Sequence, residues 1–292
     1  MPLCKSRGMF LLPSKIKKIV FIAIGLVYFG FFVLISQIPD NKFHIYFLDI
    51  GQGDSVLIKT PQNHQMLIDG GPNSSVIERL SGIMPFFDNS IDFIILTHPH
   101  ADHVNGLIEV LKKYSVNAIL MTGVSSKSPI YEEFLRTVYN KKIPVFIAES
   151  KTDFKFGNVF FDVIYPFNQI SGEYFENPNN SSVAVKVSYK DELSRVSEKI
   201  LLTGDLQDII ESKLVDAGID LKANILKAGH HGSKNASSLK FLNKVKPDFA
   251  VIQSGKDNRF GHPHKQTLDN LKKAGVKKIY RNDMDGTVEF VF

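Results

Sequence analysis

Hydrophobic and polar positions follow two patterns along residues 43–292. Short apolar runs bounded by turn-forming residues predict β-strands, and stretches with apolar residues three or four positions apart predict helices. The predicted strands cover residues 43–50, 55–60, 65–69, 93–97, 118–122, 145–148, 158–164, 183–189, 199–203, 224–228, 249–253 and 286–292. The predicted helices cover residues 75–81, 103–114, 130–141, 207–217, 237–245 and 265–274.

The order of these elements predicts the architecture. Strands cluster at residues 43–69 and again at 145–203, and strands alternate with helices around each cluster. Two β-layers with helices outside fit this order better than one doubly wound sheet. Residues 167–180 are rich in turn formers and predict a surface loop. The body is therefore expected to be an α/β domain spanning 43–292.

A different pattern precedes the body. Residues 19–38 contain no charged side chain, and 20 helical residues span about 30 Å, the thickness of a bilayer core. Lys15, Lys17 and Lys18 stand just before this run. The positive-inside rule then predicts a cytoplasmic basic tip at 1–18, a single-pass transmembrane anchor at 19–38 and an extracytoplasmic body. A cleaved signal peptide and a buried core helix are the alternatives, although Ser36-Gln37-Ile38 is a poor cleavage site.

Composition adds two exclusions. The chain of 292 residues is 43% hydrophobic and 22% charged, which excludes wholesale disorder. Its single cysteine, Cys4, excludes an intramolecular disulfide and a cysteine-based metal cluster. The net charge of +5 resides in residues 1–18, and residues 19–292 carry 30 basic and 30 acidic side chains. Net charge therefore gives no argument that the body binds a polyanion.

Candidate metal ligands are concentrated after the predicted strand 93–97. His98, His100, Asp102 and His103 fall within six residues, between that strand and an amphipathic helix. Side chains two apart in an extended segment project to the same side, whereas adjacent residues at a helix start point differently. One short loop can thus supply two neighbouring metal positions. Imidazole and carboxylate ligands suit Zn²⁺, and oxygen-rich sets suit Mn²⁺ or Fe²⁺.

Further candidates follow other strands, where carboxyl ends meet at one edge of a sheet. They are Asp69, Asp205, the pair His230 and His231, and His262 with His264 beside it. Taken singly, a His-x-His is usually a surface feature and an Asp before Gly a turn or cap residue. Six of the nine histidines nevertheless fall in three compact motifs. We therefore expect a metal site.

These residues resemble the metallo-β-lactamase superfamily, whose signature is His-x-His-x-Asp-His. The resemblance is strongest to the hydrolase domain of ComEC-like DNA-uptake competence proteins and their stand-alone relatives, and it spans nearly all of 43–292. The runs that carry it are FLDIGQGD (47–54), LIDGG (67–71), THPHADH (97–103), NNSS (179–182), LTGD (202–205), LKAGHHGS (226–233) and GHPH (261–264). The resemblance implies an αββα four-layer sandwich with two divalent metal ions, Zn²⁺ or else Mn²⁺, at one edge.

The resemblance also suggests a division of the ligands. Many superfamily members have a histidine in the loop before the Thr-Gly-Asp strand, but here Asn179, Asn180 and Ser182 stand in that region. We expect His230 or His231 to fill this vacancy beside His98 and His100. His262, or His264 in its place, would complete the other position with Asp102 and His103, and Asp205 would bridge the two. Asp102 and Asp205 are then the candidate catalytic carboxylates.

The remaining expectations concern catalysis and substrate. Two divalent metals activate a water for attack, so no side-chain nucleophile is needed. Asp69 would orient a ligand histidine, and Asn179, Asn180 and Ser182 are candidates for substrate binding or for hydrogen bonds within their loop. The resemblance favours a phosphodiesterase or nuclease, with single-stranded DNA the leading partner. A phosphocholine ester, a lactam or another ester, and a non-catalytic metal-binding subunit of a membrane assembly remain alternatives. Candidate phosphate contacts, if not simply solvated, are Lys227, Lys234, Lys256 and Arg259.

Overall fold

The apolar run near the N-terminus forms one helix, α1 (Ser14–Ser36). The computed structural model describes residues 13–36, 38, 40–191 and 197–292, so residues 1–12 of the predicted tip, with Cys4, lie outside the described part. The chain divides into two units, Met1–Asp40 and Asn41–Phe292. Helix α1 is long and apolar enough to cross a membrane, a test that a signal sequence also passes. The boundaries at 18, 19, 38 and 43 stay predictions.

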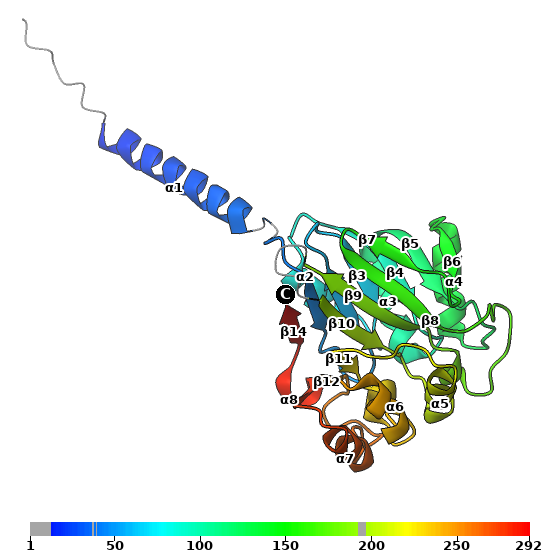
Figure 1. Cartoon of the computed structure of the whole chain (residues 1–292). Coiled ribbons are helices and arrows are strands. Elements are labelled where there is room, and N and C mark those ends of the chain that lie inside the picture. The colour runs from blue at the N-terminus through cyan, green and yellow to red at the C-terminus, as the bar shows by residue number, and fades with distance from the viewer. Residues whose placement is uncertain (1–12, 37, 39, 192–196) are drawn as a thin grey trace, which may run out of the picture. The chain divides into compact units, whose positions relative to one another are not determined.

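The second unit contains two seven-stranded sheets (Figure 1). The first sheet has the order β14-β1-β2-β3-β4-β5-β6: Val288–Val291, His44–Phe47, Val56–Lys59, Gln65–Ile68, Ser90–Leu96, Ser115–Met121 and Val145–Ile147. The second has the order β13-β12-β11-β10-β9-β8-β7: Lys278–Arg281, Phe249–Ile252, Ile225–Lys227, Ser197–Leu202, Ala184–Lys190, Val159–Tyr165 and Phe154–Phe156. Each sheet joins an antiparallel part to a parallel part, and β3 to β6 and β10 to β13 run parallel.

Three hydrophobic layers hold these sheets together. Alternate residues of a strand point to opposite faces, so Val56 and Ile58 of β2 pack in the central layer while Leu57 packs toward the helices. The outer layer on the first sheet is formed with α2 (Ser75–Ile83), α3 (Ala101–Lys113) and α4 (Pro129–Asn140). On the second sheet it is formed with α5 (Asp208–Asp216), α6 (Leu239–Val245) and α7 (Lys265–Lys273). The predicted αββα four-layer sandwich is confirmed.

Two glycines set how closely β3 approaches α3. A Cβ on Gly106 would overlap the carbonyl of Gly70, and a Cβ on Gly70 would overlap the backbone of Leu107. Gly70 N–H donates to the His103 carbonyl at 2.8 Å, and Gly106 N–H donates to the Gly71 carbonyl at 2.9 Å. This contact brings the residue that follows β3 against the first turn of α3, where two of the candidate ligands lie.

The sequence prediction missed several short elements. Strand β7 has three residues, and β13, Lys-Ile-Tyr-Arg, lies partly exposed at the edge of its sheet. Neither carries the continuous apolar run of a central strand. The remaining missed elements are α8 (Asn282–Asp285) and two 3₁₀ turns, η1 (Pro178–Ser181) at the end of the predicted loop and η2 (Gly229–Gly232). Helix α3 begins at Ala101, so Asp102 lies within its first turn.

Candidate metal centre

The candidate ligands lie at the carboxyl ends of strands from both sheets. His98 and His100 follow β4, and Asp102 and His103 begin α3. Asp205 follows β10, η2 after β11 supplies His230 and His231, and the segment after β12 supplies His262. The carboxyl ends of β4 in the first sheet and of β10 to β12 in the second border the same cluster, so that His103 and His231, 128 positions apart in the sequence, meet here.

One carboxylate oxygen lies at the centre of this cluster. The Oδ2 atom of Asp205 is 3.1 Å from His231 Nε2, 3.3 Å from His103 Nε2, 3.8 Å from His230 Nε2 and 4.0 Å from His98 Nε2. Asp102 Oδ2 lies 3.4 Å from His231 Nε2. The His100 ring centroid is 4.7 Å from that of His98. Asp205 and four of the predicted histidine ligands therefore surround one point, with Asp102 beside His231 and His100 beside His98.

The chemistry of this donor set fits divalent cations. The Nε2 atoms of His98, His103 and His231 are buried and have no hydrogen-bond partner among the described residues. A buried polar atom without a partner is costly, and a metal ion satisfies several such atoms at once. Four groups of three residues have their ligand atoms within 4.8 Å of one another, and two of them consist of predicted ligands alone: His98, His103 and Asp205, and Asp102, His103 and His231.

Backbone geometry aims the paired histidines at the cluster. His230 and His231 both have left-handed conformations, with φ of 47° and 52°. This conformation is uncommon for residues other than glycine and persists where the surrounding structure imposes it. Gly232 continues the turn, and the His231 Nδ1 atom lies 3.0 Å from the Gln253 carbonyl, so that Nε2 faces Asp205.

Asp69 orients His103. Its Oδ2 atom lies 2.7 Å from His103 Nδ1 and accepts from the Thr97 hydroxyl at 2.7 Å, while Oδ1 accepts from Thr97 N–H at 2.8 Å. A carboxylate that accepts from one ring nitrogen directs the other toward the cluster. Burial raises the pKa of Asp69, although the His103 imidazole acts in the opposite direction.

The histidines fall into two electrostatic classes. Burial lowers the pKa of His98, His100 and His230, which favours the neutral imidazole that binds a metal. Burial also acts to lower the pKa of His103 and His231, but Asp205 together with Asp69 beside His103, and with Asp54 and Asp102 beside His231, raises both well above the usual value. A cation that binds these two imidazoles must therefore displace protons.

Lys227 and Asp54 form a buried ion pair beneath the cluster, and the sequence did not reveal it. Both residues are 2% exposed, and their charged groups are in direct contact. Lys227 Nζ also donates to the Gly204 carbonyl at 2.9 Å and lies 3.7 Å from Asp205 Oδ1, and Asp54 Oδ1 lies 3.1 Å from His231 Nδ1. The expectation that Lys227 contacts a phosphate or solvent is wrong, because the side chain points into the protein.

Glu211 is a second buried charge that no motif indicated. Its carboxylate accepts from the backbone N–H groups of Ser237 at 2.6 Å and Ser238 at 2.9 Å. Burial raises the pKa of Glu211 to about 7. Because the Ser237 hydroxyl accepts from Gly229 N–H at 3.2 Å, this network holds the start of η2 in place.

The remaining predicted residues lie at different distances from the cluster. The Asn179 side-chain amide lies 3.4 Å from His230 Nε2, so this residue reaches the cluster. The Asn180 backbone carbonyl accepts a hydrogen bond from the Tyr165 hydroxyl at 2.9 Å. Ser182 is fully buried, and its hydroxyl accepts from Asp205 N–H at 3.2 Å, which favours holding Asp205 over touching a substrate.

His262 and His264 lie beside the paired histidines. The His262 ring centroid is 5.6 Å from that of His230 and 6.3 Å from that of His231. Burial and three neighbouring histidines lower the pKa of His262 to about 4. His264 Nδ1 accepts from Lys234 N–H at 3.2 Å. The distances therefore favour His231 over His262 beside Asp102 and His103.

Several described proteins are similar to this chain over nearly its whole length. ComE operon protein 3 of Bacillus subtilis is 28% identical over 281 residues, which cover 89% of this chain and 34% of the relative. Competence protein ComA of Neisseria gonorrhoeae is 29% identical over 260 residues, covering 87% of this chain and 33% of the relative. The chain thus spans about a third of the length of these relatives, and the resemblance to ComEC-like proteins is confirmed.

Solved structures support the fold. The metallo-β-lactamase fold protein YhfI of Bacillus subtilis has a TM-score of 0.51 at 14% identity, and the match covers 85% of this chain and 99% of that one. The family model described as the metallo-β-lactamase superfamily matches residues 48–256. Members of this superfamily bind divalent metals and are usually hydrolytic. With its two sheets and its cluster of histidine and aspartate side chains, the chain belongs to the metallo-β-lactamase superfamily.

Proposed function

We propose that residues 43–292 form a metal-dependent phosphodiesterase, with single-stranded DNA as its leading substrate. The observation that carries this proposal is the convergence of four imidazole Nε2 atoms within 4.0 Å of one Asp205 oxygen. Three of these atoms are buried without a hydrogen-bond partner among the described residues, an arrangement that costs stability unless a cation completes it.

The ligands divide into two sets around Asp205. We assign His98, His100 and His230 to one cation, and Asp102, His103 and His231 to the other, with Asp205 between them. The first set contains the three imidazoles whose pKa is lowered by burial. The second set contains the anionic Asp102 and two imidazoles. His262 is the alternative to His231 in the second set.

The protein's own groups prepare the site for hydrolysis. Divalent cations held by these histidine and aspartate side chains would polarise a target oxygen and would lower the pKa of water to about 7, which would supply a nucleophile at neutral pH. Asp69 fixes the ring of His103, and Asp54 with the Gln253 carbonyl fixes that of His231. The Asn179 amide, next to His230, is placed to donate to an anionic oxygen of the substrate.

Substrate class follows from the relatives and from local charge. One relative is named competence protein ComA and another ComE operon protein 3, and a role like theirs in competence favours a nucleic acid as substrate. Lys234, Lys256 and Arg259 are exposed on the loops that carry His231 and His262. They supply positive charge near the site for a phosphate backbone, although the body as a whole is neutral.

A substrate panel tests this proposal. The full chain, purified in detergent and reloaded with Zn²⁺ or Mn²⁺, should hydrolyse both bis(4-nitrophenyl) phosphate and single-stranded DNA. Activity should disappear with chelator and fall at least about 100-fold in Asp102→Ala, because that change removes a ligand. Asp216→Ala, which alters an exposed carboxylate paired with Lys240, is the matched control and should keep full activity.

Other outcomes of the panel would reject the proposal in distinct ways. Turnover of a lactam or a 4-nitrophenyl phosphocholine ester alone would assign another substrate class. A fully metal-loaded chain without activity on any compound would favour the non-catalytic metal-binding role.

We further propose that α1 is an uncleaved single-pass anchor, with residues 1–18 in the cytoplasm and the 43–292 body outside. Its length, its composition and the lysines at its N-terminal end support this topology. Protease added to intact spheroplasts should then degrade the body, and mass spectrometry of the untreated chain should find the peptide containing Lys15, Lys17 and Lys18. Protection of the body until lysis would contradict the topology, and loss of that peptide would indicate a cleaved signal sequence.

A further inference from the structure

A hollow of about 480 Å³ opens next to the metal centre. Asp102 forms part of its wall, together with Gln52, Pro72 and Ala101. The opposite wall is the segment 258–260, which follows β12. A molecule in this hollow therefore contacts a residue of the centre itself.

The hollow has an exposed aromatic wall. The Phe260 side chain is 48% exposed, and its ring stacks on that of His262 with centroids 5.7 Å apart and planes inclined by 23°. The Arg259 guanidinium lies 4.9 Å from the centroid of the Phe260 ring. An aromatic ring left in water next to a cation is suited to a planar, electron-rich partner that also carries negative charge.

The segment that carries Phe260 is held in one conformation. The Asn258 amide donates to the carbonyls of Gly255 at 2.9 Å and His262 at 2.6 Å. Its Oδ1 atom accepts from the N–H groups of Phe260 at 3.2 Å and His262 at 3.0 Å. The ring is therefore presented before any ligand arrives, which reduces the entropy lost on binding.

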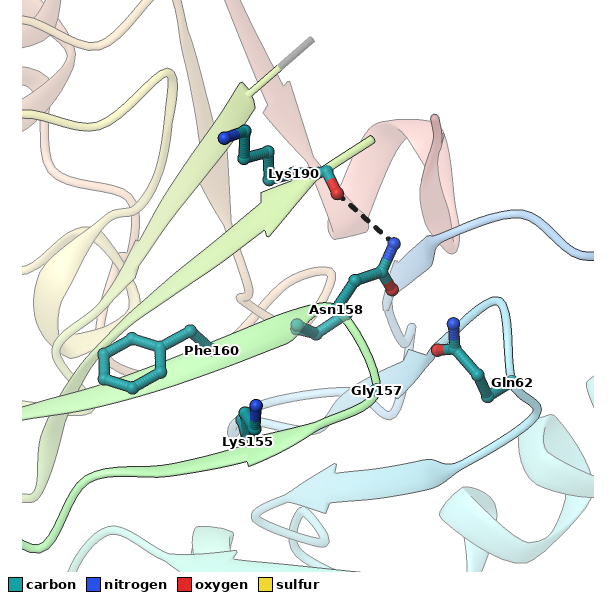
Figure 2. Close-up of a pocket in the computed structure, with 7 residues that line it drawn as sticks. Gln62, Lys155, Gly157, Asn158, Phe160 and Lys190 are labelled. Carbon is teal, nitrogen blue, oxygen red and sulfur yellow. Dashed lines mark hydrogen bonds between the residues drawn. The ribbon is translucent and has the colours of Figure 1, made fainter. Parts of the chain in front are cut away.

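A second hollow lacks this combination. Figure 2 shows a hollow of about 760 Å³ at the turn between β7 and β8, with Gln62 on the facing turn and the Asn158 amide donating to the Lys190 carbonyl at 3.3 Å. Lys155 and Phe160 also line it, but no ligand of the metal centre does. Of these two hollows, the one beside Asp102 joins an exposed aromatic ring to a candidate metal ligand.

We propose that the hollow beside Asp102 binds the nucleobase next to the phosphate that is cleaved, stacked on the Phe260 ring together with the Arg259 guanidinium that lies over it. This inference rests on the proposed phosphodiesterase function and specifies how its substrate is held. Stacking of a base on an aromatic side chain contributes about 1–3 kcal/mol, equivalent to roughly 5- to 150-fold in rate or affinity. Because a base must be unpaired to enter, single strands are better substrates than duplexes.

The test compares two matched oligonucleotides on the full metal-loaded chain in detergent. One is a thymidine oligomer, and the other has the same backbone without bases. The unaltered chain should hydrolyse the thymidine oligomer roughly 5- to 150-fold faster at subsaturating concentration. Phe260→Ala should abolish this preference, so that the two oligomers are hydrolysed at the same rate, and Phe260→Tyr should restore it. Phe87→Ala, at another exposed phenylalanine, is the control and should keep the preference.

A binding measurement separates failure of the subsite from failure of the proposed function. An oligomer carrying 2-aminopurine should lose fluorescence on binding to the unaltered chain but not to Phe260→Ala, because stacking quenches this base. The subsite alone is overturned if the unaltered chain hydrolyses both oligomers at equal rates. It is also overturned if Phe260→Ala slows hydrolysis of both oligomers by the same factor. If neither oligomer is hydrolysed, the phosphodiesterase proposal fails. If the 2-aminopurine fluorescence is then quenched equally by the unaltered chain and by Phe260→Ala, the subsite is overturned as well.

Discussion

Replacing Asp205 with asparagine should remove both cations and lower phosphodiester hydrolysis by more than about 100-fold. The Oδ2 atom of Asp205 lies within 4.0 Å of four imidazole nitrogens, so both ligand sets lose their shared anionic oxygen. Metal analysis per chain after dialysis measures the first effect, and turnover of bis(4-nitrophenyl) phosphate measures the second. Retention of two cations per chain by Asp205→Asn would contradict the central position of this carboxylate.

A matched pair of histidine variants identifies the partner of Asp102 and His103. If His231 is the ligand, His231→Ala should retain about one cation of two, and His262→Ala should retain both. The reason is distance: His231 Nε2 lies 3.4 Å from Asp102 Oδ2 and 3.1 Å from Asp205 Oδ2. The reverse result would return His262 to the position that the family resemblance suggested.

Replacing Lys227 with methionine should lower the free energy of unfolding by about 3–5 kcal/mol. The change leaves Asp54 as a buried carboxylate without its cation and leaves the Gly204 carbonyl without its donor. Burial acts to lower the pKa of Lys227, but Asp54 and Asp205 raise it, so the charged form is the native one. Urea unfolding measured with chelator present reports this loss free of any contribution from bound metal.

A double-mutant cycle distinguishes the ion pair from loss of packing alone. Asp54→Asn with Lys227→Met removes both charges, and the double variant should be destabilised by less than the sum of the single variants. Additive losses would show that the two charges do not stabilise one another. A loss below about 1 kcal/mol in Lys227→Met would contradict the buried pair altogether.

Local sequence was sufficient to locate the chemistry. The candidate ligands His98, His100, Asp102 and His103 fall within six residues, and their spacing between an apolar strand and an amphipathic helix is visible without coordinates. The strands that precede Asp69, Asp205 and His230 were likewise visible as apolar runs. Their convergence followed from the predicted fold class, in which strands of both sheets end beside the site.

Contacts between residues far apart in the sequence could not be predicted from local spacing. Lys227 follows an apolar run and looks like any lysine near a loop, yet in the fold it is buried against Asp54, 173 positions earlier. Glu211 lies in an amphipathic helix, where an acid is normally solvated, but it caps the backbone at Ser237 and Ser238. Such pairs depend on how helices and strands pack, which no local spacing encodes.

The amino-acid order by itself determined the layers, the strand-end positions of the ligands and the apolar helix, because these follow from periodicity and from residue type within a few positions. Only the tertiary structure decided that His231 faces Asp102, that Ser182 holds Asp205 and that Phe260 borders the site. Each of these depends on a backbone conformation or a contact across the two sheets, such as the left-handed turn at residues 230–231. Packing fixes those features after the elements have formed, so the pattern along the chain carries no signal for them.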